Sequence, residues 1–206
     1  MVKHDNTQVK IEVNEVLRGT VHPMQWRAVS EATERELGYA EAQVVAFEDL
    51  YAGKICAALD RQHPRDLFDC QQLLSSGPTL PAPFLDTFIV YLISHNRPIA
   101  ELLNPRFANI SGVFEQEVRH MPRSTITLQS LETARLQLID SIRGGLTETH
   151  KAFLLSFKSL KPQWHLLSLP DIEKLPSVRW KLQNIANMSA MQHKQAVRKL
   201  EQTLQI

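Results

Sequence analysis

Features that mark several large classes of protein are scarce in this chain of 206 residues. Its two cysteines, Cys56 and Cys70, are too few for a disulfide framework, and they lack metal-binding spacing. No apolar run approaches the roughly 18 residues that a membrane-spanning helix needs. The N-terminus also lacks the apolar core of a secretory signal. We therefore expect a cytoplasmic protein without a membrane span, with both cysteines in its core.

Several catalytic signatures with a fixed spacing are also missing. The sequence contains no Gly-x-Ser-x-Gly, no Gly-x-x-x-x-Gly-Lys-Ser/Thr, no His-Glu-x-x-His and no Cys-x-x-Cys. Serine hydrolase, P-loop and zinc-enzyme chemistry are therefore not expected. We also find no helix-turn-helix with a basic recognition helix, which argues against a DNA-binding regulator.

The composition is that of a globular chain, with 43% hydrophobic residues, 22% charged residues and a net charge of +1. The charge is unevenly distributed. Residues 1–150 hold 14 Lys and Arg against 19 Asp and Glu, whereas residues 151–206 hold nine against three. The C-terminal part is therefore a candidate anion-binding surface. A solvated helix face stays open as the simpler interpretation, because these basic residues are spread out.

Hydrophobic periodicity changes along the N-terminal third. Residues 8–14 alternate between polar and apolar types, which predicts a half-buried strand. Residues 26–37 have the pattern of a polar helix that Gly38 ends, and residues 42–47 that of a short apolar strand. Helical spacing then runs to about Asp60. Pro64, a type favoured at a first helical position, opens a second helix that reaches about Leu74.

Beyond a turn-rich segment at residues 77–83, the pattern is helical throughout. Helices are predicted at 84–94, 99–103, 110–119, 128–143, 147–159, 178–187 and 189–205, with a short one starting within 169–173. The sequence thus predicts an α+β fold with two domains. The first covers residues 1–76, and the second, mainly helical, covers residues 77–206.

The densest group of charged residues lies in residues 47–69, on both sides of Pro64. The run Phe47-Glu48-Asp49-Leu50-Tyr51-Ala52-Gly53-Lys54, continued by Arg61 and Arg65-Asp66-Leu67-Phe68-Asp69, resembles the lysine-plus-Arg-Asp motif of the AbiEii/AbiGii nucleotidyltransferase toxin family. Residues 9–14 resemble that family's second strand, and residues 175–184 resemble its C-terminal helical pattern. The resemblance covers nearly the whole chain.

The resemblance implies a partial polymerase-β-like nucleotidyltransferase core followed by a predominantly helical bundle. It also implies Mg²⁺-dependent transfer of a nucleotide from a nucleoside triphosphate (NTP) to RNA, for instance to tRNA. Such a protein is the toxin of a toxin–antitoxin system, associated with phage defence, and has a cognate antitoxin as its partner. The family's first motif, a Gly-Ser or Gly-Gly turn with paired metal-binding aspartates, is not found before residues 8–14. We therefore expect an N-terminally truncated member that binds Mg²⁺ and NTP poorly and has little or no activity.

The same resemblance implies roles for individual residues. Lys54, Arg61 and Arg65 are expected to hold nucleotide phosphates. Asp66 and Asp69, with Lys54, are the expected catalytic residues, and Glu12 is a candidate metal ligand.

Each of these roles has a simpler alternative. Lys54 is then a helix-surface lysine, and Asp66 is an ion-pair partner of Arg61 or Arg65. Asp69 either orients Lys54 or supports its helix through the helix dipole. Glu12 is a solvated strand carboxylate.

Other prominent side chains are expected to be structural. Asp49 is interpreted as a residue that helps its helix begin. His63, with no histidine at short spacing, is not expected to bind a metal. Phe153, Trp164 and Trp180 are predicted core anchors. A non-catalytic protein that binds an antitoxin or RNA through its basic end is the alternative function.

Overall fold

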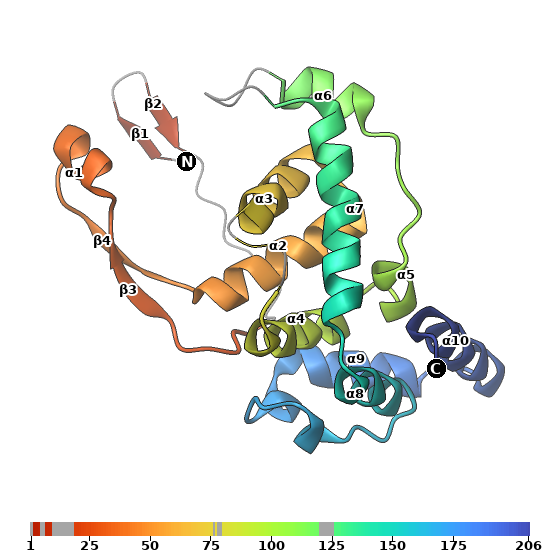
Figure 1. Cartoon of the computed structure of the whole chain (residues 1–206). Coiled ribbons are helices and arrows are strands. Elements are labelled where there is room, and N and C mark those ends of the chain that lie inside the picture. Colours follow the sequence, from red (N-terminus) through yellow and green to blue (C-terminus); the bar gives the residue numbers. More distant parts are fainter. Residues whose placement is uncertain (1, 5–6, 10–18, 76, 78–79, 120–125) are drawn as a thin grey trace.

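The computed structural model describes residues 2–4, 7–9, 19–75, 77, 80–119 and 126–206. Within these residues the chain is mostly helical and also contains two small antiparallel sheets (Figure 1). The predicted α+β class is confirmed at this level. The strands are β1 (Val2–His4), β2 (Thr7–Val9), β3 (Gln25–Ala28) and β4 (Glu41–Val44). The α-helices are α1 (Glu31–Leu37), α2 (Phe47–Arg61), α3 (Pro64–Ser75), α4 (Ala82–Ser94), α5 (Ile99–Leu103), α6 (Ser111–Glu117), α7 (Leu128–Gly145), α8 (Glu148–Lys158), α9 (Pro176–Ala186) and α10 (Ala190–Leu204).

Each described sheet is an antiparallel pair of strands, and helix α1 lies in the connection between β3 and β4. In one, Val2 of β1 lies opposite Val9 of β2, and in the other, Gln25 of β3 lies opposite Val44 of β4. Strand β2 overlaps the predicted strand at residues 8–14 only in part. Residues 10–14, which include the candidate metal ligand Glu12, lie outside the described residues.

Strands β3 and β4 and helix α1 form an arm that projects from the helical body (Figure 1). Every residue of the two strands is exposed, including Trp26. The prediction of one helix over residues 26–37 is wrong, because its first part pairs with β4. Helix α1 begins after Ser30, whose Oγ accepts a hydrogen bond from Thr33 N. Gly38 ends this helix as predicted, with its N–H donated to Glu34 O.

Helix α2 occupies the middle of the helical body. It packs against α3 and α4, while α3 packs against α7 and α4 packs against α9. One cluster of buried hydrophobic side chains extends from Ala52 in α2 to Leu204 in α10. The predicted division into two domains at residue 77 stays a prediction.

The helices after residue 80 follow their predicted positions closely, because local capping signals agree with the apolar spacing. Thr127, Thr147 and Ser189 each form a capping box at the start of α7, α8 and α10. The start signal at residues 169–173 leads into a 3₁₀ turn, η2 (Ile172–Lys174), rather than an α-helix. A second 3₁₀ turn, η1 (Trp164–Leu166), follows α8.

Most of the predicted core residues are buried. Cys56, Cys70 and Phe153 have no exposed surface, and the Trp164 ring lies 5.8 Å from that of Phe153. Trp180 is 51% exposed, so its predicted role as a core anchor is wrong. Helix α9 turns a neighbouring face inward, which places Val178 in the core instead.

Among the described helices, we find none that is both long and apolar enough to cross a bilayer.

Candidate functional site

Two ion pairs connect α2 to α3 and involve four of the five charged residues predicted in this region. Lys54 Nζ lies 2.5 Å from Asp69 Oδ2. Arg61 donates from Nε and from a terminal nitrogen to the two carboxylate oxygens of Asp66, at 2.6 and 2.9 Å. This bidentate geometry is the one that guanidinium groups use for carboxylates and phosphates. We refer to Lys54, Arg61, Asp66 and Asp69 as the α2–α3 charged face.

The turn between α2 and α3 creates this arrangement. Gln62 ends α2 in the left-handed region, with φ 51° and ψ 34°, and donates its N–H to Ala58 O. Pro64 is the first residue of α3, where its missing N–H leaves no helical bond unmade. The two helices then pack against each other, so Lys54 reaches Asp69 across 15 positions of sequence.

The charged face is partly open to solvent. The side chains of Arg61, Asp69 and Lys54 are 66%, 37% and 33% exposed, whereas that of Asp66 is 12% exposed. The hydrogen bonds that Arg61 donates to Asp66 raise the pKa of the Arg61 guanidinium, so it stays charged. Burial, with the nearby charges of Asp66 and Asp69, raises the pKa of the Cys70 thiol to about 12. Cys70 is therefore an unreactive thiol at neutral pH.

The fifth predicted residue, Arg65, points to a different partner. Its terminal nitrogen lies 3.1 Å from Glu117 Oε2 at the end of α6. His63 Nε2 lies 3.5 Å from the same oxygen. Although Arg65 is adjacent to Asp66 in sequence, the structure does not bring it into the bidentate pair.

The described carboxylates of this face do not fit a magnesium site. Mg²⁺ prefers several oxygen ligands in octahedral geometry, but Asp66 is held by Arg61 and Asp69 by Lys54. Within the described part of the chain, no group of three or more His, Cys, Asp and Glu side chains is placed to hold a metal.

Asp49 has a different structural role from the one expected. It is 2% exposed and accepts hydrogen bonds from Val21 N at 2.7 Å, His22 N at 2.9 Å and Tyr91 Oη at 2.9 Å. Its carboxylate thus fixes the segment before the arm to α2 and α4. No local pattern in the sequence could identify these partners, which are 27 to 42 positions away.

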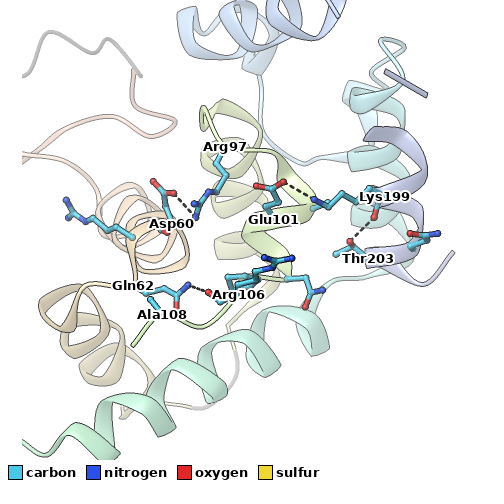
Figure 2. Close-up of a pocket in the computed structure, with 13 residues that line it drawn as sticks. Asp60, Gln62, Arg97, Glu101, Arg106, Ala108, Lys199 and Thr203 are labelled. Atoms are coloured by element: carbon cyan, nitrogen blue, oxygen red, sulfur yellow. Dashed lines mark hydrogen bonds and ion pairs between the residues drawn. The ribbon is translucent and has the colours of Figure 1, made fainter. Parts of the chain in front are cut away.

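A polar pocket of about 730 Å³ opens beside Arg61, between the end of α2, helix α5, the loop at residues 104–108 and helix α10 (Figure 2). Arg97, Arg106 and Lys199 line it together with Arg61. No motif in the sequence predicted this pocket as a site. Its one signal was the basic character of residues 151–206, to which Lys199 belongs.

A buried glutamine builds the wall of this pocket. Gln62, 4% exposed, donates from Nε2 to Arg106 O at 2.6 Å and accepts at Oε1 from Ala108 N at 3.0 Å. Arg135 donates to the same Oε1 at 3.1 Å, and its guanidinium lies 4.4 Å from the centre of the Phe107 ring. These contacts hold the loop at residues 104–108 against the end of α2.

One family model matches residues 2–184 of the chain, and it describes the nucleotidyl transferase AbiEii toxin of type IV toxin–antitoxin systems. No curated protein and no solved structure gives a significant match.

Proposed function

Because the chain belongs to the AbiEii family of nucleotidyltransferase toxins of type IV toxin–antitoxin systems, we propose that its α2–α3 charged face holds the phosphates of an NTP. Lys54 and Arg61 supply the positive charge, and Asp66 and Asp69 keep these two side chains in place. The observation that carries the proposal is the joining of α2 and α3 by the Lys54–Asp69 and Arg61–Asp66 pairs.

The chemistry of these side chains suits a triphosphate. Lys54 is a compact charge on a flexible stem, and Arg61 offers a fork of donors that matches phosphate oxygens. Both cations are accessible, since one third and two thirds of their side chains are exposed. Phosphate oxygens can therefore approach either cation without unfolding the helices. Arg65, whose side chain is 54% exposed, is a further phosphate ligand if it leaves Glu117.

In the reaction that we propose, an RNA 3′-hydroxyl attacks the α-phosphate in line. A bond forms between this oxygen and phosphorus, and the hydroxyl proton passes to water. The bond from phosphorus to the oxygen that bridges the α- and β-phosphates breaks, and pyrophosphate leaves with the negative charge. Positively charged side chains favour such a step by stabilising charge on the phosphates. Mg²⁺ supplies this stabilisation in nucleotidyl transfer generally, and we assign no step to it here because Asp66 and Asp69 do not fit a magnesium site. The cognate antitoxin is the protein partner that the family implies.

A second candidate is a non-catalytic protein that binds RNA or the antitoxin. It is favoured by the pairing of both aspartates of the charged face with cations, which suits a structural role for these carboxylates. The two candidates differ in whether label from an NTP is transferred.

The test compares wild-type protein with Lys54→Ala, and uses Lys151→Ala as a matched control. Lys151 forms a 2.8 Å ion pair with Glu148 on α8, so the control also removes a paired lysine. Binding of a fluorescent NTP is measured first, and we expect Lys54→Ala to weaken it about 10-fold or more, as expected when a charged hydrogen bond is lost. Equal binding by Lys54→Ala and wild type would refute the phosphate-holding role.

Transfer is then measured with α-³²P-labelled NTPs, Mg²⁺ and total tRNA. Label incorporation that falls in Lys54→Ala and persists in Lys151→Ala supports the transferase. Binding of the NTP without incorporation supports the non-catalytic candidate.

A further inference from the structure

The pocket beside Arg61 has a lining that is unusual for a small-molecule site. Such sites are mostly apolar, with a few polar groups that fix the ligand. Here four cations and two carboxylates, those of Asp60 and Glu101, line the cavity of about 730 Å³, together with amide and hydroxyl side chains such as Gln202 and Thr203. Among the residues that the structure describes, no aromatic side chain on which a nucleobase could stack lines the pocket. The pocket therefore suits a ligand with repeated negative charges rather than a flat apolar one.

The cations of the pocket are available to such a ligand. Arg97 lies 3.0 Å from Asp60, and Lys199 lies 2.8 Å from Glu101, and both pairs are visible in Figure 2. The side chains of these pairs are between 34% and 56% exposed. Ion pairs exposed to this degree contribute about 0–1 kcal/mol to the stability of the fold. Phosphates can therefore replace the carboxylates as partners of Arg97 and Lys199 at a small cost in free energy.

Arg106 is the cation with the fewest competing contacts. Within the described part of the chain, its guanidinium has no assigned hydrogen bond or ion pair, while its backbone carbonyl is held by Gln62. The hydrogen bond from Lys199 lowers the pKa of Glu101, and the charges of Arg97 and Arg106 lower it further. With four cations against two carboxylates among its described lining residues, the pocket carries an excess of positive charge.

We propose that this pocket binds the phosphodiester backbone of a single-stranded nucleic acid, with Arg97, Arg106 and Lys199 contacting successive phosphates. Arg61 belongs both to the pocket and to the α2–α3 charged face, so a strand in the pocket leads toward the candidate nucleotide site. The inference that this strand is the RNA that accepts the nucleotide rests on the proposed function. Its binding needs neither an NTP nor a metal.

The experiment measures binding of fluorescein-labelled single strands by anisotropy, without NTP or Mg²⁺. RNA and DNA strands of about 12 nucleotides are used, a length within the range of single-strand sites. Arg106→Glu is compared with Arg198→Glu, which makes the same charge change at an exposed position of α10 that does not line the pocket. Arg106→Ala provides a second, milder variant, and circular dichroism checks that each variant is folded.

We expect Arg106→Glu to weaken strand binding about 10-fold or more and Arg106→Ala about 3-fold or more, as is typical for a lost phosphate contact. Arg198→Glu is expected to have an effect below about 3-fold. Between about 50 and 200 mM salt, the logarithm of the binding constant should also fall less steeply with the logarithm of the salt concentration in the Arg106 variants than in wild type. Binding of RNA alone, or of RNA and DNA equally, supports the proposal and identifies the type of strand.

Three results would overturn it: no binding of either strand, equal weakening by Arg106→Glu and Arg198→Glu, or binding of polyglutamate but not of nucleic acid. The last result would identify an acidic protein as the ligand. Lys54→Ala separates this inference from the proposed function. If it leaves NTP binding intact while the Arg106 variants still lose strand binding, the proposed function fails and the pocket remains a nucleic-acid site.

Discussion

Replacing Gln62 tests how the end of α2 supports the pocket. The side chain makes hydrogen bonds to Arg106 O, Ala108 N and Arg135, and all of them are lost in Gln62→Ala. A typical hydrogen bond contributes about 1 kcal/mol to stability, and a buried polar group left without its partner costs about 1–3 kcal/mol. Arg135 is 8% exposed and its Nε already lacks a partner within the described residues. We therefore expect the free energy of unfolding to fall by about 3 kcal/mol.

Gln62→Gly separates the side-chain contacts from the backbone conformation. At φ 51° an L-residue is strained by about 1–2 kcal/mol, whereas glycine is not. Both variants lose the same hydrogen bonds, so Gln62→Gly should be more stable than Gln62→Ala by about 1 kcal/mol. Strand binding should fall in both variants, because the loop that carries Arg106 loses its attachment to α2.

Urea denaturation followed by circular dichroism measures these differences, provided that the m-value is unchanged. Gln202→Ala is the matched control, since Gln202 also lines the pocket but is exposed on α10. It should change stability by less than about 0.5 kcal/mol. The reasoning is refuted if Gln62→Ala is as stable as Gln202→Ala, or if the glycine variant is the less stable of the two Gln62 variants.

Two further predictions concern buried carboxylates. Asp49→Ala should lower the free energy of unfolding by about 3 kcal/mol, because three hydrogen bonds to its carboxylate are lost. Faster hydrogen exchange at the amides of Val21 and His22 would check it, and unchanged exchange would contradict it. Burial raises the pKa of Asp86, but hydrogen bonds from His150 and Ser168 outweigh this and lower it. The unfolded chain then binds more protons at acid pH, so stability should fall as the pH drops below about 4. Between pH 3 and 6, the urea concentration at the unfolding midpoint should depend less steeply on pH in Asp86→Asn than in wild type. An equally steep dependence in both proteins would disprove this role of Asp86.

Local signals in the sequence were sufficient for most of the helical body. Apolar spacing and caps such as Thr127 and Ser189 act within one or two turns, so α5, α7 and α10 lie close to their predicted positions. The helix pair around Pro64 followed from the same kind of local rule. The family resemblance also came from short motifs, and it is confirmed by the match over residues 2–184.

Local rules failed where distant partners decide the conformation. Residues 26–28 begin the predicted helix over residues 26–37, but pairing with residues 41–43 makes them part of a strand. Trp180 is a large aromatic residue of the kind that usually lies in a core, yet the packing of α9 on α4 leaves it half exposed.

The order of residues along the chain was enough to locate the helices of the body, the family, and the charged residues on both sides of Pro64. These properties depend on neighbours in the chain. Tertiary structure alone decided that Lys54 pairs with Asp69, that Arg65 turns to Glu117, and that Arg61 lies at a pocket with Arg106 and Lys199. The physical reason is that ion pairs and pocket walls form between segments that only the packing of the apolar core brings together.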